Sequence, residues 1–183
     1  YGGKDIYSAI YDKKKKTWGA AVNIGPDINT DGDEMFPFIH DDGTLYFGSK
    51  NGWLHHAIKE TVVSNRLSEI AHITALGEIS ETSTLVAGTN RGLFLYANQV
   101  WTQENVPKLL KEEAIQSILS FKNQCFVGNS SGIFVYQNKN WQQLVSQNQI
   151  QNADVLSLLK VDENLWIGTS KGLYVLENQV LRK

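Results

Sequence analysis

Glycine pairs recur along this chain with a period of 40 residues. Each pair has the form Gly-X-X-X-Gly, and its first glycine follows three mainly apolar residues, as in Leu165-Trp-Ile-Gly168. A fixed period of this length indicates one supersecondary unit copied in tandem, which constrains the fold more than any single residue does. The repeated glycines are Gly48, Gly52, Gly88, Gly92, Gly128, Gly132, Gly168 and Gly172.

The last repeat predicts what the unit is. Short β-rich runs at residues 155–161, 165–168, 173–176 and 179–181 are separated by turn residues, a pattern typical of a four-stranded antiparallel meander. The second and third runs are apolar at successive positions, which predicts strands covered on both faces. Four such strands in 40 residues are typical of a β-propeller blade.

The glycine frame divides the chain into blades. Complete units start near Glu34, Ile73, Ala114 and Asp154, and residues 1–24 supply a half blade. The unit that starts near Ile73 has two extra residues in its first hairpin. The sequence therefore predicts an all-β fold, a partial propeller of about 4.5 blades, with residues 1–183 forming a single domain or a propeller fragment. An open stack exposes apolar faces, so we expect a larger parent chain; ring closure by the half blade is the alternative. Pro107 predicts a short helical turn between residues 104 and 114.

Composition excludes some partners. The formal net charge is −2, from 17 basic and 19 acidic residues, which provides no general attraction for nucleic acid or anionic lipid. No apolar run reaches the length of a membrane span, so we expect no membrane insertion of this segment. The four consecutive lysines at residues 13–16 are interpreted as a solvated hairpin tip, with a polyanion site as the alternative.

Cys125 is the only cysteine, which excludes an intramolecular disulfide and a cysteine-rich metal site. It occupies the repeat position of Leu45, Leu85 and Leu165. We therefore expect a small hydrophobic core residue rather than a nucleophile.

One segment offers a weak calcium motif. Asp27, Asn29, Asp31 and Asp33 place oxygen ligands at alternating positions, as in the first half of a calcium loop. Phe38 stands where such a loop needs a bidentate glutamate, so we expect no metal site but a blade connection whose Asn and Asp side chains cap turns, with calcium binding as the alternative. No nucleophile elbow or phosphate loop is present, and we predict neither catalytic residues nor a cofactor.

Two stretches carry family resemblances. Residues 1–52 contain three motifs: Gly2-Gly-Lys-Asp-Ile-Tyr7, Asp33-Glu-Met-Phe-Pro-Phe38 and Asp42-Gly-Thr-Leu-Tyr-Phe-Gly48. They make this stretch similar to the WD-like blades of TolB-type propellers, which accompany OmpA-like domains in bacterial envelope proteins. Asn164-Leu-Trp-Ile-Gly-Thr-Ser-Lys-Gly-Leu-Tyr174 makes residues 73–183 resemble the two-component regulator propeller, a repeat of sensor ectodomains.

These resemblances imply a non-enzymatic, periplasmic or extracellular propeller. It would bind or sense a protein or glycan ligand, or act as a scaffold, in a bacterial envelope or two-component signalling protein. We expect the ligand site where the blade loops converge at the axis. The alternative is a propeller enzyme acting on glycans, a glycosidase or lyase, because fold alone does not decide activity.

Overall fold

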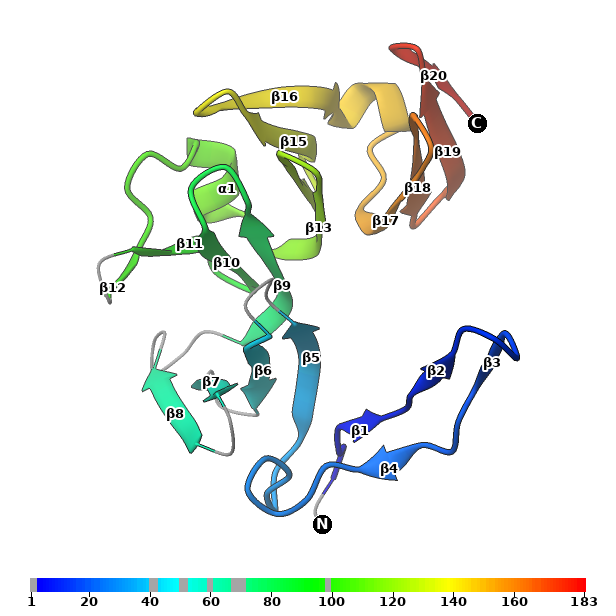
Figure 1. Ribbon diagram of the computed structural model, residues 1–183. Helices are drawn as coiled ribbons and strands as arrows, with labels where there is room; N and C mark the ends of the chain where they lie inside the picture. Colours follow the sequence, from blue (N-terminus) through cyan, green and yellow to red (C-terminus); the bar gives the residue numbers. More distant parts are fainter. Residues whose placement is uncertain (1–2, 40–42, 50–52, 59–60, 67–71, 98–99) are drawn as a thin grey trace. The chain divides into compact units, whose positions relative to one another are not determined.

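The computed structural model describes residues 3–39, 43–49, 53–58, 61–66, 72–97 and 100–183; for residues 49, 53–58, 61–66 and 97 it describes the backbone alone. The chain divides into two compact units, Tyr1–Ile70 and Ala71–Lys183. Both are built from antiparallel strands, and the helical segments of the described part are a helix of five residues and a 3-10 turn of four (Figure 1). The predicted all-β class is confirmed.

The first unit contains a long hairpin followed by a four-stranded sheet. Two nested ladders form the hairpin: β1 (Tyr7–Ser8) pairs with β4 (Val22–Asn23), and β2 (Tyr11–Asp12) pairs with β3 (Thr17–Trp18). The sheet has its strands in chain order: β5 (Glu34–Ile39), β6 (Leu45–Ser49), β7 (Trp53–Ile58) and β8 (Thr61–Arg66).

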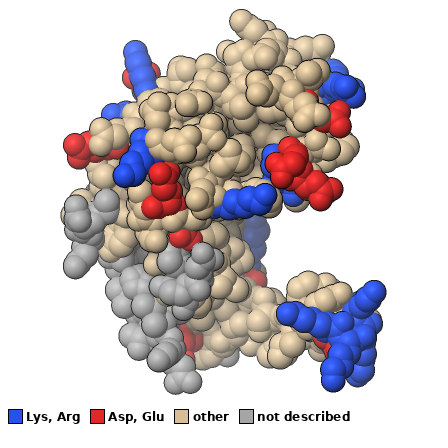
Figure 2. All heavy atoms as spheres, turned by 45° about the horizontal axis from the view of Figure 1, so that its top comes forward, with Lys and Arg blue, Asp and Glu red and all other residues tan. Residues whose placement is uncertain are grey.

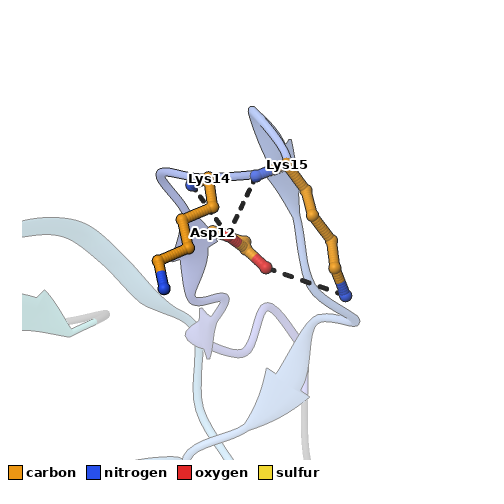
Figure 3. Close-up of polar contacts among 3 residues, drawn as sticks. All are labelled: Asp12, Lys14 and Lys15. Carbon is orange, nitrogen blue, oxygen red and sulfur yellow. Dashed lines mark hydrogen bonds and ion pairs between the residues drawn. The ribbon is translucent and has the colours of Figure 1, made fainter.

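The four consecutive lysines form the tip of the hairpin. Asp12 Oδ1 accepts hydrogen bonds from the backbone N–H groups of Lys14 and Lys15, at 2.9 and 3.0 Å (Figure 3). The carboxylate thus caps the turn, and the lysine side chains point into solvent, where basic groups gather (Figure 2). This confirms the predicted hairpin tip.

The second unit contains three four-stranded sheets, each with its strands in chain order. First strands of successive sheets contact each other, β9 with β13 and β13 with β17, so the sheets stack in series as blades do (Figure 1). The sheets are β9 (Ile73–Ile79), β10 (Thr84–Thr89), β11 (Gly92–Ala97) and β12 (Val100–Thr102); β13 (Ile115–Phe121), β14 (Gln124–Asn129), β15 (Gly132–Gln137) and β16 (Asn140–Ser146); and β17 (Val155–Val161), β18 (Asn164–Thr169), β19 (Gly172–Glu177) and β20 (Val180–Arg182).

Two hydrophobic cores lie between these three sheets. In the first core, Val86 and Leu93 of one sheet pack against residues of the next that include Ile115, Cys125 and Phe134. The second core repeats this arrangement 40 residues later, with Phe126 and Ile133 against Val155, Leu165 and Tyr174. Neighbouring residues of β14 therefore enter different cores, which is why this strand is apolar at successive positions.

The glycines of a pair have different structural roles. Gly132 has a φ of 123°, a backbone conformation that favours glycine. Gly128 instead lies within β14, where a Cβ atom would overlap Val155 Cγ1 of the next sheet. Thus one glycine permits the turn and the other permits the close approach of two sheets. Gly52 lies outside the described residues.

Each connection between these sheets inserts aliphatic side chains into the adjacent core, Val106 and Leu110 in the first and Ile150 in the second. The predicted helical turn is present as α1 (Lys108–Glu112), and Leu110 of this helix is fully buried in the first core. The next connection contains the 3-10 turn η1 (Gln147–Ile150), and Ile150 is fully buried in the second core. Leu110 and Ile150 are themselves 40 residues apart, so the connections belong to the repeat.

Candidate functional site

The predicted calcium segment binds the start of the chain. The side chain of Asn29 is buried. Its Oδ1 accepts a hydrogen bond from the Ile6 backbone N–H at 2.8 Å. Its Nδ2 donates hydrogen bonds to the Ile6 carbonyl at 2.9 Å and to Asn23 Oδ1 at 2.8 Å. The amide thereby completes the backbone hydrogen bonds of Ile6. An oxygen that already accepts an N–H in a buried site is poorly placed to bind a cation as well.

Its acidic neighbours lie in different surroundings. Asp33 Oδ1 accepts from the Lys4 backbone N–H at 2.9 Å, whereas Asp27 and Asp31 are exposed. Among the described residues, no three His, Cys, Asp or Glu side chains form a group that could hold a metal ion. Calcium binding by this segment stays an untested alternative.

A cavity of the second unit lies between two successive sheets, β9–β12 and β13–β16. It has a volume of about 510 Å³ and is open to solvent. β11 and β12 of one sheet and β15 and β16 of the next contribute to its walls. Its apolar lining is Ile79, Leu95, Tyr136 and Trp141, and its polar lining is Thr82, Thr84, Thr102, Glu104, Asn105, Lys139 and Asn140.

An aromatic pair forms one wall of this cavity. Tyr136 and Trp141 lie directly opposite each other on β15 and β16, with ring centroids 5.2 Å apart in an edge-to-face arrangement. Trp141 Nε1 is buried and has no hydrogen-bond partner within the described protein. Trp101 Nε1 of the preceding sheet is buried without a partner in the same way, so this feature belongs to the repeat and not to the cavity.

The polar side of the cavity is held in place by local hydrogen bonds. The Thr82 and Thr84 hydroxyls lie 2.8 Å apart, and Thr102 Oγ1 accepts from the Glu104 backbone N–H at 3.0 Å. The Lys139 backbone N–H donates to Glu81 Oε2 at 3.1 Å, which joins the first hairpin of one sheet to the β15–β16 turn of the next. Hydroxyl, amide and charged groups of both signs therefore surround an aromatic wall.

The irregularity of the repeat marks this place. The two extra residues of the blade that begins at Ile73 fall in the hairpin around residues 81–83, from which Glu81 and Thr82 reach the cavity region. Insertions in single repeats commonly form loops on a binding face. From the sequence, Tyr136 and Trp141 are interpreted as blade-edge packing residues, like Tyr96 and Trp101, with a stacking platform for a ligand as the alternative. The longer hairpin is the signal that could have distinguished them.

Residues of hairpins and outer strands form this cavity, whereas the predicted ligand site is at the axial loops, and that axial site stays a prediction. The described part of the chain contains no helix long and apolar enough to cross a membrane. His40 lies outside the described residues, and so do the side chains of His55 and His56.

No family description and no curated protein matches this chain in sequence. Solved structures do resemble it. The extracellular domain of BT3049 from B. thetaiotaomicron, described as a hybrid two-component system, is 19% identical with a TM-score of 0.65 over 96% of this chain and 25% of that one. The corresponding domain of BT4673 is 21% identical with a TM-score of 0.66 over 88% of this chain and 23% of that one.

The WD40 β-propeller domain of Doa1 is 14% identical, with a TM-score of 0.62 over 100% of this chain and 64% of that one. This chain spans about a quarter of the length of the two bacterial domains. At these identities the likeness concerns the fold, and with the sheets described above it establishes propeller-like repeats. The assignments of residues 1–52 to the TolB type and of residues 73–183 to the regulator type stay predictions.

Proposed function

We propose that this chain is a segment of an extracytoplasmic β-propeller that binds a ligand without turning it over, in a bacterial sensor or scaffold protein. The observation that carries the proposal is the cavity that the Tyr136–Trp141 pair walls and the longer hairpin borders. The extracellular domains of two-component systems among the similar structures support the location and the sensor role.

The lining favours a small polyhydroxylated ligand, such as an oligosaccharide. A volume of about 510 Å³ falls within the usual range for small-molecule sites. The aromatic wall suits the apolar face of a sugar ring, and the threonine hydroxyls and Asn105 suit its hydroxyl groups. Among the described lining residues Glu104 is the one carboxylate, while glycoside hydrolysis commonly uses two, so the lining favours binding over hydrolysis.

Titration of the protein with a panel of soluble oligosaccharides, followed by calorimetry, tests this proposal. We expect one or more members to bind with 1:1 stoichiometry. Trp141→Leu replaces the aromatic wall by an aliphatic side chain, and it should weaken binding about fivefold to tenfold, because an aromatic contact contributes roughly 1 kcal/mol.

Trp101→Leu is the matched control. Trp101 occupies the same repeat position in the preceding sheet and also has a buried Nε1 without a partner, but it does not line the cavity. This variant should bind as the parent protein does. Equal effects of both substitutions, or no binding by any panel member, would refute the proposal. Release of reducing ends from the panel would assign the chain to the glycan-degrading enzymes instead.

A further inference from the structure

The tip of the β2–β3 hairpin carries a concentrated positive charge. Residues 13–16 are four consecutive lysines with exposed side chains. Among the described residues of the first unit, Asp12 is the one carboxylate that pairs with them, and its Oδ2 lies 3.8 Å from Lys15 Nζ (Figure 3). An exposed pair at this distance compensates little charge. The tip therefore presents an excess of positive charge to solvent or to an anionic partner.

The lysine side chains do not hold the turn together. The Asp12 carboxylate does so, because it accepts the backbone N–H groups of Lys14 and Lys15, which lie on either side of it (Figure 3). Four ammonium groups in one short turn repel one another, so this choice of residues opposes folding slightly. Uncharged polar residues would serve the turn as well, and the fold alone does not account for the lysines.

This hairpin also departs from the repeat. Tyr11 and Trp18 lie directly opposite each other at the base of the tip and are seven positions apart in the chain. In the equivalent pairing of β15 with β16, Tyr136 and Trp141 are five positions apart. The first hairpin therefore has two extra residues, and its whole turn is basic. An insertion in a single copy of a repeat commonly forms a binding loop.

An aromatic pair lies directly behind the lysines. The ring centroids of Tyr11 and Trp18 are 5.0 Å apart, and Trp18 is 69% exposed. An indole ring presents a large apolar surface that suits the apolar face of a sugar ring. Ammonium groups and an aromatic surface are thus adjacent on one hairpin.

We propose that the β2–β3 hairpin binds an acidic polysaccharide, with the lysines at residues 13–16 contacting its carboxylates and Trp18 contacting a sugar ring. Charges are screened over about 8 Å at physiological salt, so the tip attracts anions locally although the net charge of the chain is −2. This site belongs to the first unit and does not depend on the cavity of the second.

The order of these groups along the hairpin favours a polymer over a membrane surface. The lysines occupy the tip, and both rings lie on the strands behind them. A bilayer that met the tip would contact ammonium groups and leave the rings outside the headgroup level that membrane-bound aromatic residues occupy. A polysaccharide chain can lie along the hairpin and contact both. Nucleic acids generally require a longer row of basic groups than one turn supplies.

Calorimetry with polygalacturonate fragments tests the proposal, and the fully methyl-esterified polymer is the uncharged counterpart. At low salt, the acidic polymer should bind at least about tenfold more tightly than its ester. Changing all four lysines at residues 13–16 to glutamine should weaken this binding at least about tenfold, while Asp12 still caps the turn.

The matched control removes the same charge from exposed lysines elsewhere and should weaken binding by less than about twofold. Its substitutions are Lys108→Gln, Lys122→Gln, Lys171→Gln and Lys183→Gln. Trp18→Leu should weaken polygalacturonate binding about fivefold through the lost ring contact, whereas Trp141→Leu in the cavity should leave it unchanged. The last variant separates this site from the ligand site of the proposed function.

Several results would overturn the proposal: no binding of polygalacturonate, equal binding of its ester, equal effects of the two lysine variants, or an unchanged affinity in Trp18→Leu. Tighter binding to phosphatidylglycerol vesicles or to a single-stranded oligonucleotide than to polygalacturonate would assign the hairpin to that partner and also overturn it.

Discussion

A thiol reagent added to the native protein should leave Cys125 unmodified, while the unfolded chain reacts within minutes. Cys125 is fully buried between β9–β12 and β13–β16, and this burial raises the pKa of its thiol from 9.0 to about 12. The thiolate is the reactive form. A pKa difference of 12 − 9.0 = 3 units leaves about a thousandfold less thiolate at pH 8, before steric protection is counted.

The assay follows release of the chromophore from a disulfide reagent at pH 8, with and without denaturing urea. In urea, one thiol per chain should react, because Cys125 is the only cysteine. In native buffer, the rate should be at least about a thousandfold lower, since reaction needs opening of the sheets. A native rate within tenfold of the unfolded rate would refute the assignment of Cys125 to a strand covered on both faces.

The same pKa shift predicts a loss of stability at alkaline pH. The folded state holds the Cys125 proton more tightly than the unfolded chain, so this contribution is fully present below about pH 9 and is lost as the pH rises toward 12. The loss amounts to at most about 4 kcal/mol of unfolding free energy. The variant Cys125→Leu carries the leucine that the repeat has at positions 85 and 165. Its free energy of unfolding, measured with urea, should lack this part of the pH dependence. Equal pH slopes would contradict the burial of the thiol.

Other substitutions test the remaining structural assignments. Gly128→Ala should lower the free energy of unfolding, measured with urea, by about 1–3 kcal/mol, because the added methyl group overlaps Val155. Adding Val155→Ala to this variant should recover part of the lost free energy. Asn29→Ala should lower the free energy of unfolding by about 1–3 kcal/mol, because the hydrogen bonds to Ile6 are lost. Asp27 is exposed, so Asp27→Ala should change this free energy by less than about 0.5 kcal/mol. Equal effects of the two substitutions would contradict the role of Asn29. Millimolar Ca²⁺ should leave the Tm unchanged, whereas a Tm increase that Asp31→Ala abolishes would establish the predicted calcium site.

Much of the second unit follows from local patterns in the sequence. The Gly128/Gly132 pair predicts a hairpin because positive φ and the lack of a Cβ are properties of glycine itself. The burial of Cys125 follows from its position in the repeat, since equivalent positions in stacked sheets have equivalent neighbours. Both inferences need only one repeat and its copies.

The candidate cavity could not be predicted in the same way. Tyr136 and Trp141 have the same local sequence context as Tyr96 and Trp101, and the sequence signal that sets them apart, the longer hairpin at residues 81–83, lies in the preceding sheet. The Lys139–Glu81 hydrogen bond joins residues that are 58 positions apart, which no local pattern indicates. Likewise, Asn29 fits a calcium motif by spacing, but its buried position depends on Ile6, 23 residues away.

The buried Leu110 and Ile150 also determine where this protein can accept foreign sequence. Each of these side chains fills its core only while its connection keeps its length, so extra residues between 103 and 110 would withdraw Leu110 and leave a void. The turn at residues 162–163 contains only exposed residues and carries no such constraint. Affinity tags or fluorescent reporters therefore belong at this hairpin turn, and the links between consecutive sheets should stay intact.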